Sequence, residues 1–217
     1  MRGRRSGAVS RCCLAVVCWL LFGVANTAAG PSILVLASSP DDDRILPAQE
    51  AIAFWNDRFA ELELGVRFDQ ARVVVGLPAA RTLETYARQV VTRAVQLPAG
   101  NAEPRPPSAL TDLTGDIVVL LSRQDIMSFT WRMPKVSPPR YLVVIRQVRG
   151  AYRRAAMVTR HVVAHELGHA LGLAHNAESH TLMCGPCEPL LSEPDDTGFL
   201  PLTAGERMRL RGRYPLR

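Results

Sequence analysis

Residues 165–175 read His-Glu-Leu-Gly-His-Ala-Leu-Gly-Leu-Ala-His, and the rest of the chain is best interpreted from this stretch. His165 and His169 are four residues apart, so on a helix both imidazoles project from one face and can bind one metal ion. Gly172 can end that helix, because glycine adopts a left-handed turn without a Cβ penalty. The chain can then bring His175 back toward the same ion, which makes three histidine ligands.

Three neutral imidazoles with an open fourth position are typical of a catalytic zinc site, because structural zinc sites close all four positions and usually use thiolates. Glu166, beside the first ligand, can take a proton from a zinc-activated water. Two histidines four apart with an adjacent glutamate also occur by chance, but Gly172 and His175 at these offsets are far harder to reach accidentally. His161 shares the face of His165, and we expect it near the site rather than on the metal.

The first 29 residues have the pattern of a secretory signal peptide. Four arginines in residues 2–11 precede an apolar run at 12–24, and small residues at 27–29 offer a cleavage site before Gly30. An uncleaved membrane anchor is the alternative, although the apolar run is short for a helix that spans a bilayer. We therefore expect export, to the periplasm or the medium, without stable membrane association once the leader is cleaved.

The basic character of the chain belongs largely to this leader. The formal charge of the 217 residues is +6 and falls to +2 without residues 1–29, so no nucleic-acid partner is expected. Lys135 is the only lysine among 26 basic residues, a bias that suits a GC-rich and bacterial coding genome. The length favours a single domain with a core large enough to fold unaided.

Two cysteines, Cys184 and Cys187, remain after the leader. Outside the reducing cytosol such a pair is most simply a disulfide. Thiols at this spacing can also cycle between dithiol and disulfide as in thioredoxin-like proteins, so a disulfide oxidoreductase is one alternative function. In that family the first cysteine follows a strand and begins a helix, whereas no strand-like run precedes Cys184.

Hydrophobic periodicity predicts an α+β domain. Strands are expected at 33–36 and, continuous or bent, at 66–75, and buried strands at 116–122 and 141–147. Helices are expected at 47–63, 82–96, 155–173 and 203–213, the last beginning with a capping box of Thr203 and Glu206. Residues 98–107 and the aromatic stretch 128–134 are expected to be loops. The acids at 41–43 could hold calcium, but their spacing fits no calcium loop and we expect a solvated turn.

The pattern H-E-x-x-H-x-x-G-x-x-H of residues 165–175 resembles the zinc signature of the metzincin metalloproteases. Met183 resembles the methionine of their Met-turn, and the wording of the stretch is most similar to the matrixin, or matrix-metalloprotease-like, branch. This resemblance covers about residues 161–187. It implies that the three histidines bind one zinc ion, that Glu166 is the general base and that Met183 forms an apolar floor beneath the metal. An ordinary core methionine would suit the same position.

The resemblance also implies an architecture. We expect a twisted mixed sheet with two helices above it, the zinc helix below it, and a small irregular C-terminal subdomain ending in a helix. A single catalytic domain would span residues 30–217, divided into subdomains of about 30–173 and 174–217.

The chain departs from matrixins in two ways. Matrixins usually follow the methionine with an aromatic residue and a proline, whereas this chain continues Cys184-Gly185-Pro186-Cys187, so their substrate preference does not transfer. Residues 30–164 contain no cysteine, so latency through a zinc-binding propeptide cysteine is not expected. We expect a monomeric zinc-dependent endopeptidase acting on proteins or peptides. A non-catalytic peptide-binding protein on the same fold is the alternative, which the presence of Glu166 argues against.

Overall fold

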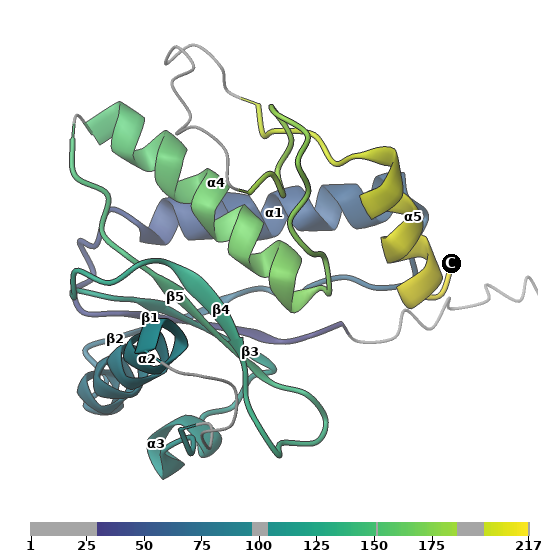
Figure 1. Cartoon of the computed structure of the whole chain (residues 1–217). Coiled ribbons are helices and arrows are strands. Elements are labelled where there is room, and N and C mark those ends of the chain that lie inside the picture. Colours follow the sequence, from purple (N-terminus) through teal and green to yellow (C-terminus); the bar gives the residue numbers. More distant parts are fainter. Residues whose placement is uncertain (1–29, 97–103, 151, 186–197, 217) are drawn as a thin grey trace, which may run out of the picture.

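A single five-stranded sheet runs through the centre of the computed structural model, which describes residues 30–96, 104–150, 152–185 and 198–216 (Figure 1). Its strand order is β2-β1-β3-β5-β4. The strands are β1 Ile33–Ala37, β2 Arg72–Val75, β3 Ile117–Leu121, β4 Phe129–Arg132 and β5 Tyr141–Ile145. The first four strands of this order are parallel, and β4 runs antiparallel to β5 at the edge. The sheet is therefore mixed, as the sequence predicted.

Helices cover both faces of this sheet. They are α1 Ile45–Glu61, α2 Ala79–Gln96, α3 Ser108–Thr111, α4 Tyr152–Ala170 and α5 Ala204–Arg213. Among the described helices, α1 and α4 share the most extensive contact. In it the indole nitrogen of Trp55 donates a hydrogen bond of 2.9 Å to the Ala164 carbonyl. Trp55 is fully buried in this contact. None of the helices in the described ranges is long and apolar enough to cross a membrane.

Alternate residues of each strand enter two separate cores. In β1, Ile33 and Val35 face α1 and α4, whereas Leu34 and Leu36 face α2. Because both faces are covered, β1 and β3 are apolar along their whole length, which is why these runs were recognisable as buried strands. The predicted helices are also confirmed, including the capping box of Thr203 and Glu206 that begins α5.

The distribution of the helices differs from the expected one. Two helices were expected above the sheet and the zinc helix alone below it, but α1 shares its face with α4, and α2 lies on the opposite face (Figure 1). The handedness of the connections explains this. The path from β1 to β2 and the path from β2 to β3 cross the sheet in opposite directions, so right-handed crossovers place α1 and α2 on opposite faces.

Two expected elements also differ from the observed ones. The aromatic loop predicted at 128–134 contains the edge strand β4, in which Phe129 and Trp131 pack against the α2 core. The strand predicted at 66–75 forms only over its second half. In the first half the side chain of Asn56 replaces a neighbouring strand, accepting a 2.8 Å hydrogen bond from the Phe68 nitrogen and donating one of 3.3 Å to the Phe68 oxygen.

Arg44 carries a buried charge at the carboxyl ends of β3 and β5. Its guanidinium forms a 2.7 Å ion pair with Asp42, and it donates hydrogen bonds to the main-chain carbonyls of Leu121, Ser122 and Ile145. The solvated turn expected at 41–43 is therefore only partly correct, because the middle acid is paired with Arg44. These bonds join the loop after β1 to the carboxyl ends of β3 and β5.

Replacing Arg44 with leucine is expected to lower the free energy of unfolding by about 3–5 kcal/mol, because Asp42 and three carbonyls lose a buried partner. Urea denaturation followed by circular dichroism measures this. The control is Arg81→Leu at an exposed position of α2, which should change stability by no more than about 0.5 kcal/mol. Equal effects of the two changes would contradict a structural role for Arg44.

Candidate active site

Helix α4 places the first two histidines, and a tight turn places the third. The helix ends at Ala170, one residue after His169. Gly172 has a φ of +91°, a left-handed conformation that residues with a Cβ rarely adopt. Glycine is therefore favoured by the backbone conformation, and the Arg213 guanidinium packs over it. The turn directs His175 back toward α4, as the sequence predicted.

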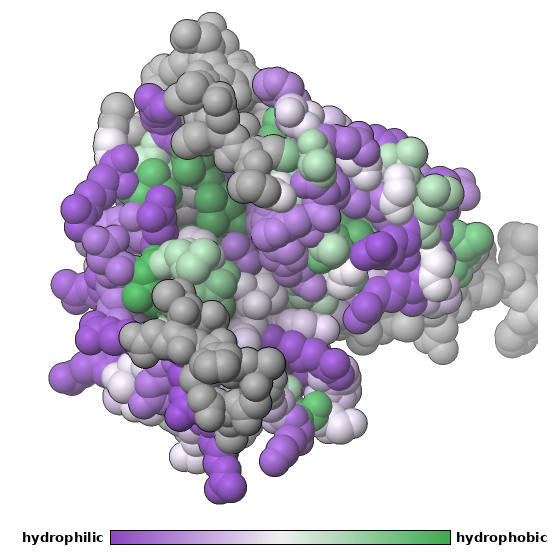
Figure 2. All heavy atoms as spheres, viewed as in Figure 1, coloured by the Kyte–Doolittle hydropathy of each residue, from purple (hydrophilic) through white to green (hydrophobic). Residues whose placement is uncertain are grey.

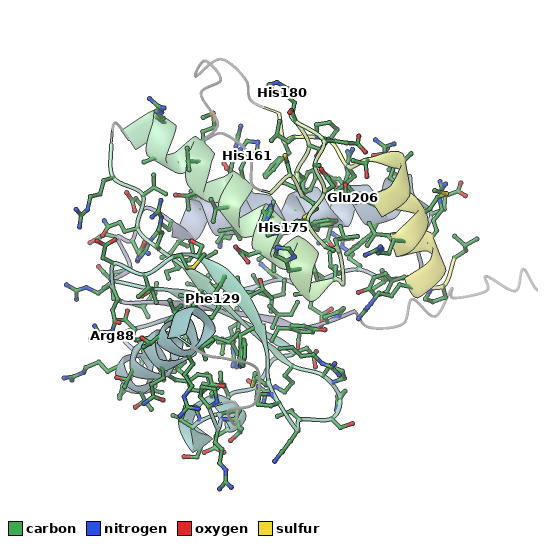
Figure 3. All side chains as sticks on the ribbon, viewed as in Figure 1. Arg88, Phe129, His161, His175, His180 and Glu206 are labelled. Carbon is green, nitrogen blue, oxygen red and sulfur yellow. The ribbon has the colours of Figure 1, made fainter. Side chains whose placement is uncertain are left out.

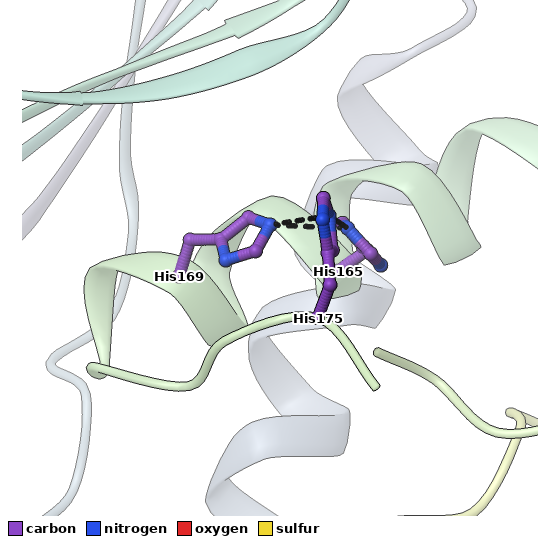
Figure 4. A group of neighbouring side chains, drawn as sticks. All are labelled: His165, His169 and His175. Carbon is purple, nitrogen blue, oxygen red and sulfur yellow. Dashed lines mark hydrogen bonds between the residues drawn. The ribbon is translucent and has the colours of Figure 1, made fainter. Parts of the chain in front are cut away.

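The three histidines converge through their Nε2 atoms (Figure 4). Each pair of these nitrogens, in His165, His169 and His175, is separated by 3.1 Å. Nitrogen ligands about 2.0–2.1 Å from a tetrahedral zinc ion lie about 3.3 Å from one another, so the triangle fits one ion. Within the described parts of the chain, no other group of three or more His, Cys, Asp or Glu side chains is arranged to hold a metal.

Main-chain carbonyls determine which imidazole nitrogen of His165 and of His169 is free to bind a metal. His165 Nδ1 lies 2.7 Å from the Leu182 oxygen, and His169 Nδ1 lies 2.9 Å from the Leu173 oxygen. A carbonyl only accepts, so each Nδ1 carries the proton and each Nε2 presents a lone pair. Two lone pairs at 3.1 Å repel each other unless a cation lies between them. These carbonyls are the partners of the ligand histidines that the sequence does not identify.

Burial keeps the first two histidines neutral. Loss of solvent lowers the pKa of His165 and of His169, and their hydrogen bonds to carbonyls oppose this only in part. A neutral imidazole is the form that binds a metal, so protons compete less for these nitrogens than for an exposed histidine.

Met183 lies beneath α4 and is fully buried. Gly168 makes the room for it, since a Cβ there would lie 2.5 Å from the Met183 sulfur. The Met183 carbonyl accepts a 2.9 Å hydrogen bond from the nitrogen of Asn176, the residue after the third histidine. The turn that buries Met183 therefore also holds the segment that carries His175.

Asn176 and Glu206 support this segment, and sequence analysis did not connect them. The Asn176 amide donates a 2.7 Å hydrogen bond to Glu206, whose other carboxylate oxygen accepts from the Thr203 nitrogen at 2.8 Å (Figure 3). The capping box was predicted from the sequence, but nothing in it signals that Glu206 also reaches the histidine loop. Helix α5 is thereby tied to the site.

Glu166 is nearly buried, at 7% exposure, beside the three histidines. Desolvation raises its pKa from 4.5 to about 7, and a hydrogen bond from Thr130 opposes the rise. The Thr130 hydroxyl lies 2.8 Å from Oε2 of Glu166 and 2.7 Å from its main-chain oxygen. Thr130 was not among the predicted site residues because residues 128–134 were expected to form a loop, whereas Thr130 belongs to the edge strand β4.

Two further histidines lie apart from the triangle. His161 is buried, with Nδ1 2.8 Å from the Met157 oxygen and its ring 5.3 Å from that of Phe199, in agreement with the expectation that it is not a ligand. His180 is exposed at the outer end of its loop, away from His175 (Figure 3).

The cysteine pair is only half described. Cys184 lies just after Met183 and is partly buried, and its neighbour Gly185 packs against the His175 ring, with room for no Cβ. Cys187 lies outside the described residues, as does the leader. The disulfide between Cys184 and Cys187 therefore stays a prediction.

Glu166→Gln is expected to stabilise the metal-free protein at high pH. The raised pKa means that between pH 4.5 and about 7 the folded state binds more protons than the unfolded chain, so stability falls as the pH rises through this range. The gain should reach about 2–3 kcal/mol near pH 8 and vanish near pH 4. Urea unfolding at both pH values measures it. A gain independent of pH would contradict the raised pKa.

Comparison with known proteins agrees with this geometry. The family model described as Matrixin, of peptidase family M10, matches residues 85–195. No significant match was found among curated proteins. The crystal structure of archaemetzincin (amzA) from Methanopyrus kandleri is similar at 15% identity and a TM-score of 0.45, over 85% of this chain and 95% of that one. Because the family model matches more than half of its residues, the chain belongs to the matrixin family of zinc metallopeptidases.

Proposed function

We propose that this protein is an exported zinc-dependent endopeptidase. His165, His169 and His175 would hold the ion, and Glu166 would be the general base. The observation that carries the proposal is the convergence of three Nε2 atoms, 3.1 Å apart, next to a nearly buried carboxylate. A pure binding protein has no use for such a carboxylate, because burying it destabilises the fold.

In this proposal Glu166 is the residue that transfers the proton. When bound, zinc supplies Lewis-acid polarisation of the scissile carbonyl and lowers the pKa of the attacking water. Glu166 takes the proton from that water and then donates it to the leaving amine. Its carboxylate is buried next to the histidine triangle, which puts it within reach of a water at that position.

The edge strand β4 would hold the substrate. Among the residues that the structure describes, no strand pairs with its outer side, so an extended peptide can add to it through main-chain hydrogen bonds. The Thr130 hydrogen bond places β4 directly beside Glu166, so a peptide added to β4 would pass the site. Protein or peptide substrates follow from the family, and endopeptidase rather than terminal cleavage is part of this proposal.

The export route and the lineage rest on the sequence. The leader at 1–29, with cleavage before Gly30, supports secretion or a periplasmic location in a bacterium. The wording of residues 165–175 supports a place in the matrix-metalloprotease-like branch, and the Cys184–Cys187 disulfide would suit an oxidising compartment. Mass spectrometry of the secreted protein tests both the new N-terminus and the disulfide.

Glu166→Gln is expected to lower zinc-dependent casein hydrolysis by at least about 100-fold, because the general base is lost. Elemental analysis should still find one zinc ion per chain in this variant. A zinc chelator should abolish the activity of the wild type. The matched control is Glu63→Gln, the same chemical change at an exposed position after α1, which should keep full activity.

Purified mature protein without stoichiometric zinc would contradict the main proposal. Two other outcomes would each indicate a different function. Tight peptide binding with no hydrolysis, unchanged in Glu166→Gln, would indicate the non-catalytic peptide-binding protein. Insulin reduction that is lost in Cys184→Ser would indicate the disulfide oxidoreductase.

A further inference from the structure

The hydroxyl of Thr130 contacts Glu166 at two points. It lies 2.8 Å from Oε2 of the carboxylate and 2.7 Å from the main-chain oxygen of the same residue. The hydroxyl has one proton, so it donates either to the main-chain oxygen or to the ionised carboxylate, and a protonated Glu166 can in turn donate to the hydroxyl. Strand β4 thus offers the Glu166 carboxyl group a partner outside its own helix.

The register of the sheet fixes this hydroxyl. Thr130 is paired with Val143 of β5, a fully buried residue of the core beneath α1 and α4. Its neighbours Phe129 and Trp131 point to the other face, into the α2 core. A shift of one residue would turn Thr130 away from α4 and bring an aromatic side chain against Glu166. Packing on both faces of the sheet therefore fixes the register that turns Thr130 toward α4.

We propose that Thr130 is a positioning residue that holds Glu166 in its working orientation. This inference rests on the endopeptidase function proposed above. With Oε2 bound to Thr130, the other carboxylate oxygen is left to take the proton from the attacking water. A free glutamate side chain has several rotatable bonds, and fixing it in advance removes an entropic cost from the transition state.

Threonine is well suited to this position. Its hydroxyl can donate a hydrogen bond and can also accept one, so it matches the carboxyl group before and after proton transfer. Its methyl group keeps the branched shape that a strand favours. Valine has the same shape without the hydroxyl, and serine has the hydroxyl without the methyl. The two substitutions therefore separate hydrogen bonding from packing.

We expect Thr130→Val to lower kcat by about 10- to 100-fold, the usual cost of losing an outer-shell partner, with KM and zinc content unchanged. Thr130→Ser should retain kcat within about threefold of the wild type. A defect in packing alone would affect both variants or would change stability and zinc content together. Steady-state kinetics on a fluorogenic peptide, elemental analysis and urea unfolding provide the three readouts.

A Thr130→Val variant with wild-type kcat would overturn the inference, and so would a Thr130→Ser variant as slow as Thr130→Val. If the valine variant does not fold, Thr130→Ala replaces it, and the same comparison with serine applies. Wild-type protein without zinc-dependent hydrolysis would instead remove the proposed function. The two failures are thus distinguishable.

An independent observation concerns the charge along the edge strand. Residues 123–160, which span β4, β5 and the first half of α4, contain nine basic residues and one acid, Asp125. Arg132 ends β4, and the Arg146 nitrogen donates a 3.1 Å hydrogen bond to Ser128 just before β4 begins. Both arginine side chains are exposed, and neither forms an ion pair within the described parts of the chain.

We infer that the same site, if it is the proposed endopeptidase, prefers acidic peptides. Arg132 alternates with Thr130 and so lies on the α4 side of β4, where a peptide antiparallel to β4 would pass it with its N-terminal part. Figure 2 shows hydrophilic residues gathered on the side of the molecule where β5 leads into α4. The Arg132 cation attracts acidic side chains on the N-terminal side of the scissile bond and repels basic ones.

Fluorogenic peptides that differ only in flanking glutamate or lysine test this preference. We expect kcat/KM to be about tenfold higher for the glutamate peptide at low salt, with a smaller ratio at about 1 M salt. The variant Arg132→Glu should reverse the preference. The control Arg81→Glu makes the same change in charge at an exposed position of α2 and should leave it unchanged.

Equal cleavage of the two peptides by the wild type would overturn this inference, and so would a preference that survives the charge reversal at Arg132. If the reversed variant does not fold, Arg132→Gln should reduce the preference toward one. Absence of cleavage of either peptide would again count against the endopeptidase function itself rather than its specificity.

Discussion

The close approach of the Met183 sulfur to Gly168 is the packing contact on which the site depends. Even a methyl group at Gly168 would lie 2.5 Å from that sulfur, so the segment after residue 181 can lie against α4 only because the helix has a notch there. In this position the Leu182 carbonyl orients His165, and the Met183 carbonyl holds Asn176 beside His175. The contact between Gly168 and Met183 thereby holds the segment that orients His165 and supports His175.

Two of the buried charged residues in the described part of the chain, Arg44 and Glu166, have very different surroundings. Arg44 is surrounded by an ion pair and three carbonyls, which satisfy its donors and make it part of the framework. Glu166 has the Thr130 hydroxyl for its carboxylate, and the loss of solvent raises its pKa to about 7. A poorly compensated carboxylate destabilises the fold, and such groups are concentrated at functional sites. The contrast itself indicates which of the two residues serves chemistry.

The topology of the sheet brings the edge strand β4, Glu166 and the three histidines together. Strand β4 lies at the edge because β5 inserts between it and β3, so no strand of the described ranges adjoins the other side of β4. Helix α4 follows β5 directly and returns across the same face as α1, so its Glu166 meets Thr130 of that edge strand. A possible peptide-binding edge and the histidine triangle are therefore neighbours through topology, although the sequence separates Thr130 from His165 by more than thirty residues.

The sequence by itself predicted the three converging histidines, the glycine turn and most of the elements, because each depends on local spacing along the chain, while the resemblance to metzincins pointed to Met183. It did not reveal that α1 shares the face of α4, because crossover direction depends on strand order. It did not reveal β4 either, because four residues at an edge carry too weak a pattern. Thr130, Asn176 and Glu206 were decided only by tertiary structure, since each acts on a residue that is distant in the chain and adjacent only after the sheet and helices have packed.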